Sequence, residues 1–147
     1  MTELSVTQRV LVNASAACIW RAITSPDDLV AWYAPGCRWE VPSLRPGAEV
    51  RFFNTEMDVQ TAIVEAVEAP HRLVLRWRID PHDPSATIVN SFLLQPAGVE
   101  TEVTVSQSGY ETLAASVQRD SLEQDRAAVA AIALSLKAYA EARNQRD

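Results

Sequence analysis

Residues 120–144, DSLEQDRAAVAAIALSLKAYAEARN, decide the fold of this chain. The segment is rich in residues that favour helix, and Ser121 is suited to begin it. Apolar residues recur every three or four positions and form one stripe, made of Val129, Ile132, Ala133, Leu136 and Tyr139. A helix with a single apolar stripe must bury that stripe against a second layer. The residues that precede it must supply this layer.

The segments before this helix have the pattern of antiparallel strands. In residues 72–79, RLVLRWRI, Leu73, Leu75, Trp77 and Ile79 alternate with a face that carries three arginines. Turn residues separate the other predicted strands, which cover 4–12, 37–41, 48–53, 57–68, 86–95 and 100–107. The prolines of DPHDPS predict a loop over 80–85, and Pro-Ala-Gly predicts a hairpin turn over 96–98.

Two short helices are predicted between the first and second strands. Asn13 or Ser15 can cap the first helix, whose apolar face contains Ile19, Trp20 and Ile23. Ser25 and Pro26 begin the second helix, which stops before Pro35-Gly36. The predicted fold class is therefore α+β. We expect a single domain over residues 1–147, with an antiparallel sheet in one layer and the long helix in the other.

Composition and charge narrow the class of protein. The 147 residues, 48% of them hydrophobic, suit one domain with one core. The net charge of −6 repels phosphate backbones and anionic membrane surfaces, so we expect no nucleic acid and no membrane partner. The start MTELSVTQRV lacks the features of a signal peptide, and no apolar run approaches the ~20 residues that span a bilayer. We therefore expect a cytoplasmic protein.

Motifs for known catalytic chemistry are missing. The sequence contains no GxSxG, P-loop, GxGxxG or HExxH, and its cysteines, Cys18 and Cys37, form no CxxC pair. Asp80, His82 and Asp83 are metal-binding residue types, but one short loop seldom supplies a complete coordination shell. We expect no metal and no cofactor, and the catalytic residues, if any, are unknown. Residues 123–125, EQD, are expected to be the charged first turn of the last helix.

Aromatic side chains are the strongest candidates for a site. By alternation, Phe52 and Trp77 face the long helix, where they can line a pocket rather than fill it. The candidate polar groups are Arg51, Asn90, Gln107 and Tyr110. Gln107 shares the strand phase of Val103 and Val105, and a buried glutamine needs hydrogen-bond partners from the protein, from water or from a ligand.

Four stretches, in their order and spacing, resemble one protein family. They are VLVNASAACIWRAITSPDDLVAWYAPG (10–36), SLRPGAEVRF (43–52), EAPHRLVLRW (68–77) and the strands over 86–107, which close in VSQSGY. They resemble the family of the activator of the 90-kDa heat-shock protein ATPase, in the START-like superfamily. The resemblance covers nearly the whole chain and implies a helix-grip fold, in which a curved sheet wraps around a long C-terminal helix.

Two positions depart from the family pattern. Gln107 stands where members often have His, and Ala128-Val129 stands where they often have Gly-Trp. Loss of a large indole beneath the helix either enlarges the cavity or is filled when its neighbours repack. The Gln107 replacement also removes the most obvious polar group that could contact a ligand or take part in catalysis.

The resemblance implies a cavity between sheet and helix, with Trp32 and Trp39 near its mouth. Superfamily members include lipid carriers, hormone receptors, aromatic cyclases and co-chaperone domains, and fold alone does not choose among them. We expect a protein that binds a small apolar or aromatic ligand. One alternative is a cyclase or hydratase in which Tyr110, Gln107 or Arg51 polarises a carbonyl. Another is a co-chaperone-like interaction module. A homodimer paired through sheet edges is also open.

Overall fold

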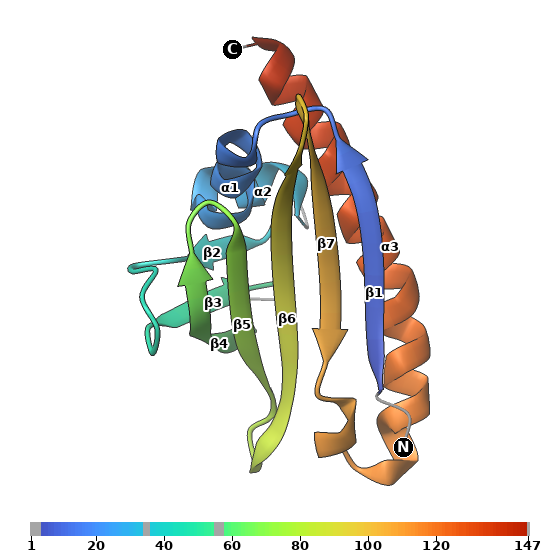
Figure 1. The fold of residues 1–147 in the computed structure, drawn as a ribbon. Helices are drawn as coiled ribbons and strands as arrows, with labels where there is room; N and C mark the ends of the chain where they lie inside the picture. The colour runs from blue at the N-terminus through green and yellow to red at the C-terminus, as the bar shows by residue number, and fades with distance from the viewer. Residues whose placement is uncertain (1–3, 34–35, 55–57, 147) are drawn as a thin grey trace.

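The computed structural model describes residues 4–33, 36–54 and 58–146. In that part of the chain, seven antiparallel strands form one sheet in the order β1-β7-β6-β5-β4-β3-β2 (Figure 1). The strands are β1 (Ser5–Val12), β2 (Arg38–Glu40), β3 (Glu49–Phe53), β4 (Val59–Glu68), β5 (Arg72–Asp80), β6 (Asp83–Ala97) and β7 (Glu100–Ser108). Consecutive strands from β2 to β7 are neighbours, and β1 joins the edge beside β7.

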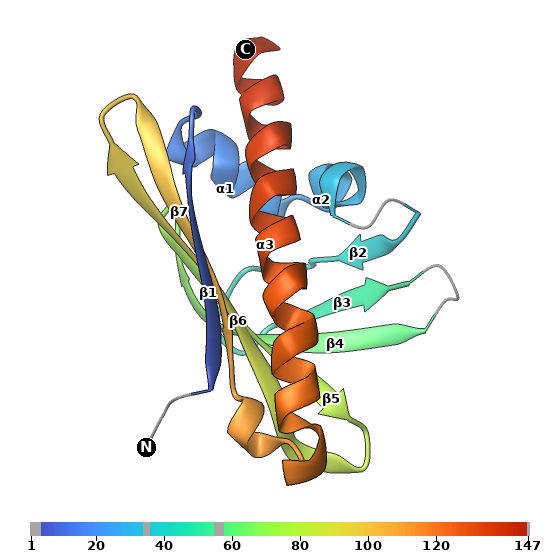
Figure 2. The same ribbon diagram turned by 90° about the vertical axis from the view of Figure 1, so that its right-hand side faces the viewer.

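The helices lie on one side of this sheet. They are α1 (Ala16–Thr24), α2 (Pro26–Trp32), the 3-10 turn η1 (Tyr110–Thr112) and α3 (Ala115–Arg146). The sheet bends around α3, while α1 and α2 close the end nearest the C-terminus (Figure 2). The structure therefore confirms the predicted α+β helix-grip architecture.

Burial along α3 follows the predicted apolar stripe. Val129, Ala133 and Leu136 are fully buried, and Ile132 and Tyr139 pack against them while half-buried. The helix begins at Ala115, six residues before the predicted start at Ser121. The prediction was wrong there because these first turns bury no apolar side chain, so the stripe that identifies the helix does not extend to them.

The connection between β5 and β6 is shorter than the loop predicted over 80–85. Asp80 pairs with Asp83 across the sheet, and the Asp80 carboxylate accepts a hydrogen bond from the His82 backbone N–H at 2.8 Å. An aspartate that satisfies the backbone two residues later makes a tight turn, so this segment continues the hairpin. A register shift near the end of β5 leaves Ile79 49% exposed, although alternation predicted that it faces the helix.

Helix capping agrees in part with the predictions. Ser15 caps α1, since its Oγ accepts a hydrogen bond from the Cys18 backbone N–H at 3.1 Å. Pro26 is at the start of α2, where its missing N–H has no cost. Pro35 and Met57, at which a helix end and a strand start were predicted, lie outside the described residues.

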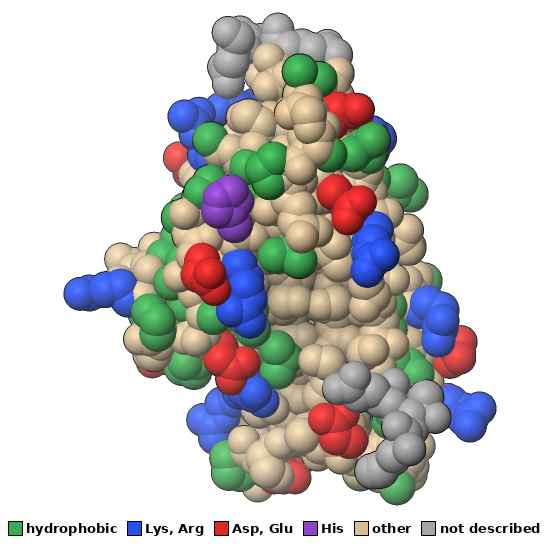
Figure 3. Space-filling model, viewed as in Figure 1, with side chains coloured by type: hydrophobic (Ala, Val, Ile, Leu, Met, Phe, Trp, Pro, Cys, Tyr) green, Lys and Arg blue, Asp and Glu red, His purple; other side chains and the backbone are tan. Residues whose placement is uncertain are grey.

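The face of β4 and β5 turned away from α3 is solvated, as predicted for the arginines of β5. Arg72 forms an ion pair with Glu68 at 3.0 Å, and Arg76 pairs with Glu65 at 2.8 Å. Figure 3 shows basic and acidic side chains side by side on this face. Exposed pairs of this kind each contribute less than about 1 kcal/mol. In the described part of the chain, no helix has the length and hydropathy to span a membrane.

Gly109 controls how β7 turns into η1. Its φ is +96°, and a Cβ at this position would lie 2.6 Å from the Thr87 carbonyl oxygen. We predict that Gly109→Ala lowers the free energy of unfolding by about 2 kcal/mol or more, through backbone strain and this clash. The matched control is Gly98→Ala, at φ +69° with nothing within 4 Å, which we expect to cost about 1 kcal/mol. Equal losses in urea unfolding would contradict the close approach at Gly109.

Candidate functional site

Two adjoining hollows lie between the sheet and α3, with volumes of about 180 Å³ and about 50 Å³. They adjoin because four side chains line both: Tyr33, Trp39, Trp77 and Gln107. The larger hollow is also lined by Phe52, Gln60, Ile79, Ile88 and Asp125. The smaller one continues inward to Ile23, Leu29, Trp32, Leu75, Asn90 and Phe92. Together they are called the aromatic cavity below.

Strand pairing places the aromatic rings of this cavity. Trp39 of β2 pairs directly with Phe52 of β3, and their ring centroids are 4.8 Å apart. Trp77 of β5 lies 5.8 Å from Trp39, and Tyr33, just after α2, lies 5.3 Å from Trp39. Both contacts to Trp39 are edge-to-face, with an interplanar angle of 73°. The rings therefore form neighbouring walls that meet at steep angles.

The indoles of Trp32 and Trp39 have different roles. Trp32 Nε1 donates a hydrogen bond to the Ala22 carbonyl at 2.7 Å. That carbonyl lies in the last turn of α1, and the residue four positions later, Pro26, has no N–H to offer it. Trp32 thus satisfies a backbone acceptor that the helix cannot. Trp39 Nε1 is buried and has no hydrogen-bond partner among the described residues.

A polar group closes the cavity on the α3 side. Tyr110 is fully buried, and its hydroxyl donates a hydrogen bond to Asp125 Oδ2 at 2.7 Å. The same hydroxyl lies 3.2 Å from Gln107 Oε1. A hydroxyl carries one hydrogen, so the shorter bond to the carboxylate takes it and leaves Gln107 Oε1 able to accept another.

Burial and Asp125 together keep the tyrosines near this group neutral. Burial is the largest cause that raises the pKa of Tyr110, followed by its hydrogen bond to Asp125. Burial also raises the pKa of Tyr33, and the negative charge of Asp125 adds to the effect, followed by Cys37. At neutral pH both hydroxyls hold their protons, so Tyr110 acts as a hydrogen-bond donor to a carboxylate.

The structure brings most of the predicted site residues together. Those that line the aromatic cavity are Trp32, Trp39, Phe52, Trp77, Asn90 and Gln107. Tyr110 contacts two lining residues, as described above. Arg51 lies elsewhere: it is on the opposite face of β3, where its exposed guanidinium pairs with Glu49 at 3.6 Å and Glu40 at 3.8 Å. The alternation of β3 that turns Phe52 toward the cavity turns Arg51 away from it.

The sequence interpretation missed Tyr33 and Asp125. It assigned Asp125 to a solvated first turn, but α3 starts ten residues earlier, at Ala115. Asp125 precedes the buried Val129 by four residues, and this spacing was the signal for its position on the inward stripe. Val129 itself is fully buried and lines neither hollow, so neighbouring side chains occupy the space around it.

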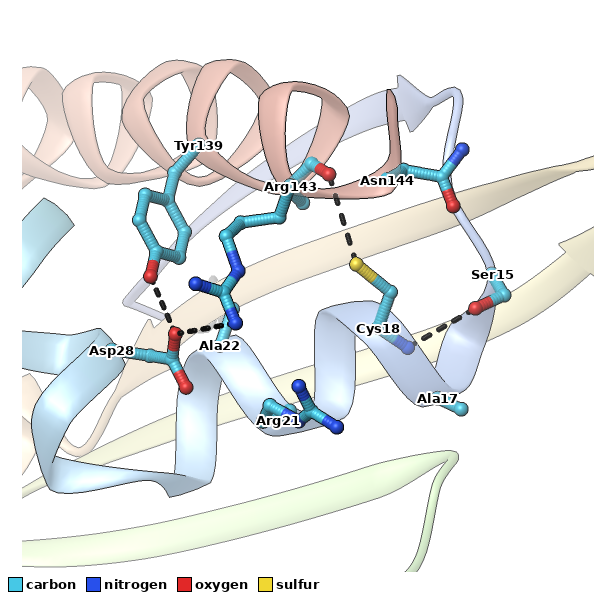
Figure 4. A pocket seen from close by; sticks show the side chains of 10 residues that line it. Ser15, Ala17, Cys18, Arg21, Ala22, Asp28, Tyr139, Arg143 and Asn144 are labelled. Carbon is cyan, nitrogen blue, oxygen red and sulfur yellow. Dashed lines mark hydrogen bonds and ion pairs between the residues drawn. The ribbon is translucent and has the colours of Figure 1, made fainter. Parts of the chain in front are cut away.

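A second hollow, of about 240 Å³, lies where α1 and α2 meet the end of α3 (Figure 4). The Tyr139 hydroxyl donates a hydrogen bond to the buried Asp28, and Arg143 Nη2 lies 3.9 Å from the same carboxylate. Burial, then the bond to Asp28, raises the pKa of Tyr139. These contacts join α2 to α3, so this polar hollow surrounds a structural connection.

A broader depression of about 580 Å³ lies on the outer face of β3, β4 and β5. Every residue that lines it is exposed or half-buried. The described residues also contain no group of three or more His, Cys, Asp or Glu side chains placed to hold a metal ion. Among the three hollows, the aromatic cavity alone combines buried aromatic walls with convergent polar groups, which is the usual form of a small-molecule site.

A curved antiparallel sheet that closes over one long C-terminal helix, with an apolar cavity between them, defines a helix-grip domain of the START-like class. The chain belongs to the family described as Activator of Hsp90 ATPase homolog 1-like protein, whose model matches residues 13–141. No curated protein matches the chain.

Solved structures share the fold at low sequence identity. Protein MLL2253 from Mesorhizobium loti is 20% identical with a TM-score of 0.77, over 92% of this chain and 95% of its own. The Aha1 dimer from Colwellia psychrerythraea is 19% identical with a TM-score of 0.76, over 96% of this chain and 97% of its own. DynU16, a protein in the dynemicin biosynthetic locus, is 22% identical with a TM-score of 0.73, over 97% of this chain and 49% of its own.

The contrast between the two indoles is testable by matched substitution. Trp32→Phe and Trp39→Phe each remove a similar part of a buried ring, but only the first leaves a buried carbonyl, that of Ala22, without its donor. We predict that Trp32→Phe lowers the free energy of unfolding by at least about 1 kcal/mol more than Trp39→Phe. Urea unfolding followed by circular dichroism measures both. A larger loss for Trp39→Phe would show that its N–H is bonded.

Proposed function

We propose that this protein binds a small apolar or aromatic molecule in the aromatic cavity. The observation that carries the proposal is the convergence of four aromatic rings and Gln107 around space that no side chain fills. Well-packed interiors leave few voids larger than a water molecule, so an unfilled space with rigid aromatic walls favours a ligand. The aromatic rings supply most of the contact area.

The volume of the cavity limits the size of the ligand. An engineered protein cavity of about 150 Å³ can hold benzene. The larger hollow, about 180 Å³, is therefore suited to one ring or a chain of similar size, and the adjoining 50 Å³ accepts a substituent. A molecule with several fused rings requires part of it to extend out of the cavity.

Two polar groups can orient the ligand. The buried Trp39 Nε1 has no acceptor among the described residues, and an unsatisfied buried donor costs about 1–3 kcal/mol. A ligand that offers an acceptor to this N–H removes the cost after a small movement of the ring. Gln107 lines both hollows, so its amide is placed to meet a ligand from either one.

The proposal is tested by a thermal-shift screen of aromatic and polyketide-like compounds. A ligand that binds only the folded state stabilises it by RT ln(1 + [L]/Kd), about 2.7 kcal/mol at one hundred times Kd. We expect stabilisation by a subset of compounds with one ring. Phe52→Ala removes a cavity wall and should weaken binding at least fivefold. Leu93→Ala, on the solvent side of β6, should leave binding unchanged.

Native mass spectrometry of protein purified from its own host complements the screen. A co-purified mass that Phe52→Ala loses supports the proposal, whereas silence in both experiments would remove it. A ligand whose mass changes on incubation would instead support the cyclase or hydratase alternative.

A homodimer stays a prediction, supported by the dimer formed by the Colwellia psychrerythraea protein. In the described part of the sheet, β1 and β2 are the edge strands and each pairs on one side only. Unpaired edges present backbone N–H and C=O groups that a second copy can pair with. Sedimentation should then give twice the 16.2 kDa of one chain, and a single-chain mass at high concentration would contradict it.

A further inference from the structure

The charge inside the aromatic cavity bears on the identity of its ligand, and the inference rests on the function proposed above. Asp125 is the only charged side chain among the described residues that line the two hollows. In the described part of the chain, no ion pair joins Asp125 to a basic side chain. The cavity therefore carries one negative charge that no protein cation neutralises.

The hydrogen bonds around Asp125 leave that charge available. The Tyr110 hydroxyl bonds to Oδ2 at 2.7 Å, which satisfies one carboxylate oxygen and fixes the orientation of the group. This bond brings a donor but no positive charge. A carboxylate against apolar walls is costly unless a counter-charge or further donors accompany it. A ligand with a positive charge supplies both.

The walls favour the same kind of ligand. Tyr33, Trp39, Phe52 and Trp77 surround the larger hollow, and neighbouring rings in this group meet at interplanar angles between 51° and 85°. Aromatic faces carry partial negative charge and attract cations, and cages of such rings bind ammonium groups. The raised pKa of Tyr33, caused by burial and then by Asp125, agrees with a negative potential on this side of the cavity.

We infer that the aromatic cavity binds a small organic cation, in which a primary or methylated ammonium group on an apolar frame lies between the aromatic rings and Asp125. The ammonium group contacts the ring faces and faces the free oxygen of Asp125. The apolar frame extends inward toward Trp32 and Phe92 in the smaller hollow. Fatty acids and other anions are disfavoured, because their carboxylate would share the cavity with that of Asp125.

Choline and its uncharged carbon isostere, 3,3-dimethylbutan-1-ol, test the charge directly. The two probes have nearly the same shape and differ by one positive charge. We expect choline to bind the intact protein at least about tenfold more tightly, measured by tryptophan fluorescence and checked by calorimetry. Similar affinities for both probes would overturn the inference, and the proposed binding of neutral aromatic compounds would remain.

Asp125→Asn isolates the carboxylate. The amide oxygen can still accept the Tyr110 hydrogen bond, so the variant keeps the contact between η1 and α3 and loses only the charge. We expect at least about a tenfold loss of choline affinity and less than a twofold change for the isostere. The matched control is Glu123→Gln, which removes an exposed charge two residues away on α3 and should change neither affinity. Unchanged choline binding by Asp125→Asn would overturn the inference.

A choline group can also come from a lipid headgroup. Glycerophosphocholine, titrated in parallel, distinguishes the two sources. We expect it to bind at least about fivefold more weakly than choline, because its phosphate approaches the negative charge of Asp125. Tighter binding of glycerophosphocholine than of choline would assign the cation to a headgroup. If neither probe binds while neutral aromatic compounds stabilise the protein, the cation is excluded and the cavity stands as an apolar site.

Discussion

The hydrogen bond from Tyr110 to Asp125 is the contact on which the geometry of the cavity depends. It joins the turn after β7 to the third turn of α3, and Tyr110 is fully buried while it does so. Gly109, at a φ of +96°, turns the chain so that Tyr110 enters the space between sheet and helix. Without this contact, the N-terminal half of α3 would be held mainly by apolar packing, which is less directional. The bond also sets where the one cavity charge lies.

The opposite half of α3 is held by a second polar contact of the same kind. Tyr139 donates to the buried Asp28 of α2, and Arg143 lies close to the same carboxylate. Each end of the helix is therefore fixed by a tyrosine and an aspartate, with Val129, Ala133 and Leu136 buried between them. A helix fixed at both ends cannot easily collapse onto the sheet, which allows the aromatic cavity to persist unfilled.

Sequence patterns predicted the parts of the fold in which burial repeats with a fixed period. The alternation in β5 and the stripe of α3 were predicted because side chains at period 2 or 3.6 share a face. Ile79 was misplaced because the register shift at the end of β5 breaks that period. The start of α3 was misplaced because no buried residue marks it. The fold as a whole therefore depended on periodic signals that the sequence contains.

The candidate site was harder to predict because it depends on contacts between separate segments. Phe52 and Trp77 followed from strand phase alone, whereas the position of Asp125 required the true start of the helix and its partner Tyr110. The different roles of Trp32 and Trp39 depend on which N–H finds an acceptor, and Ala22 becomes that acceptor because Pro26 cannot bond to it. Such pairings have no period and become visible only in three dimensions.

The most direct test of the aromatic cavity is the response of the four tryptophan indole N–H signals in ¹H–¹⁵N NMR spectra as a stabilising ligand is added. If the cavity is the binding site, the signals of Trp39 and Trp77 should shift most, with a smaller change at Trp32. Trp20, which lies on α1 and lines neither hollow, should not move. Shifts confined to Trp20, or none at all under saturating ligand, would place binding elsewhere and contradict a site between the sheet and α3.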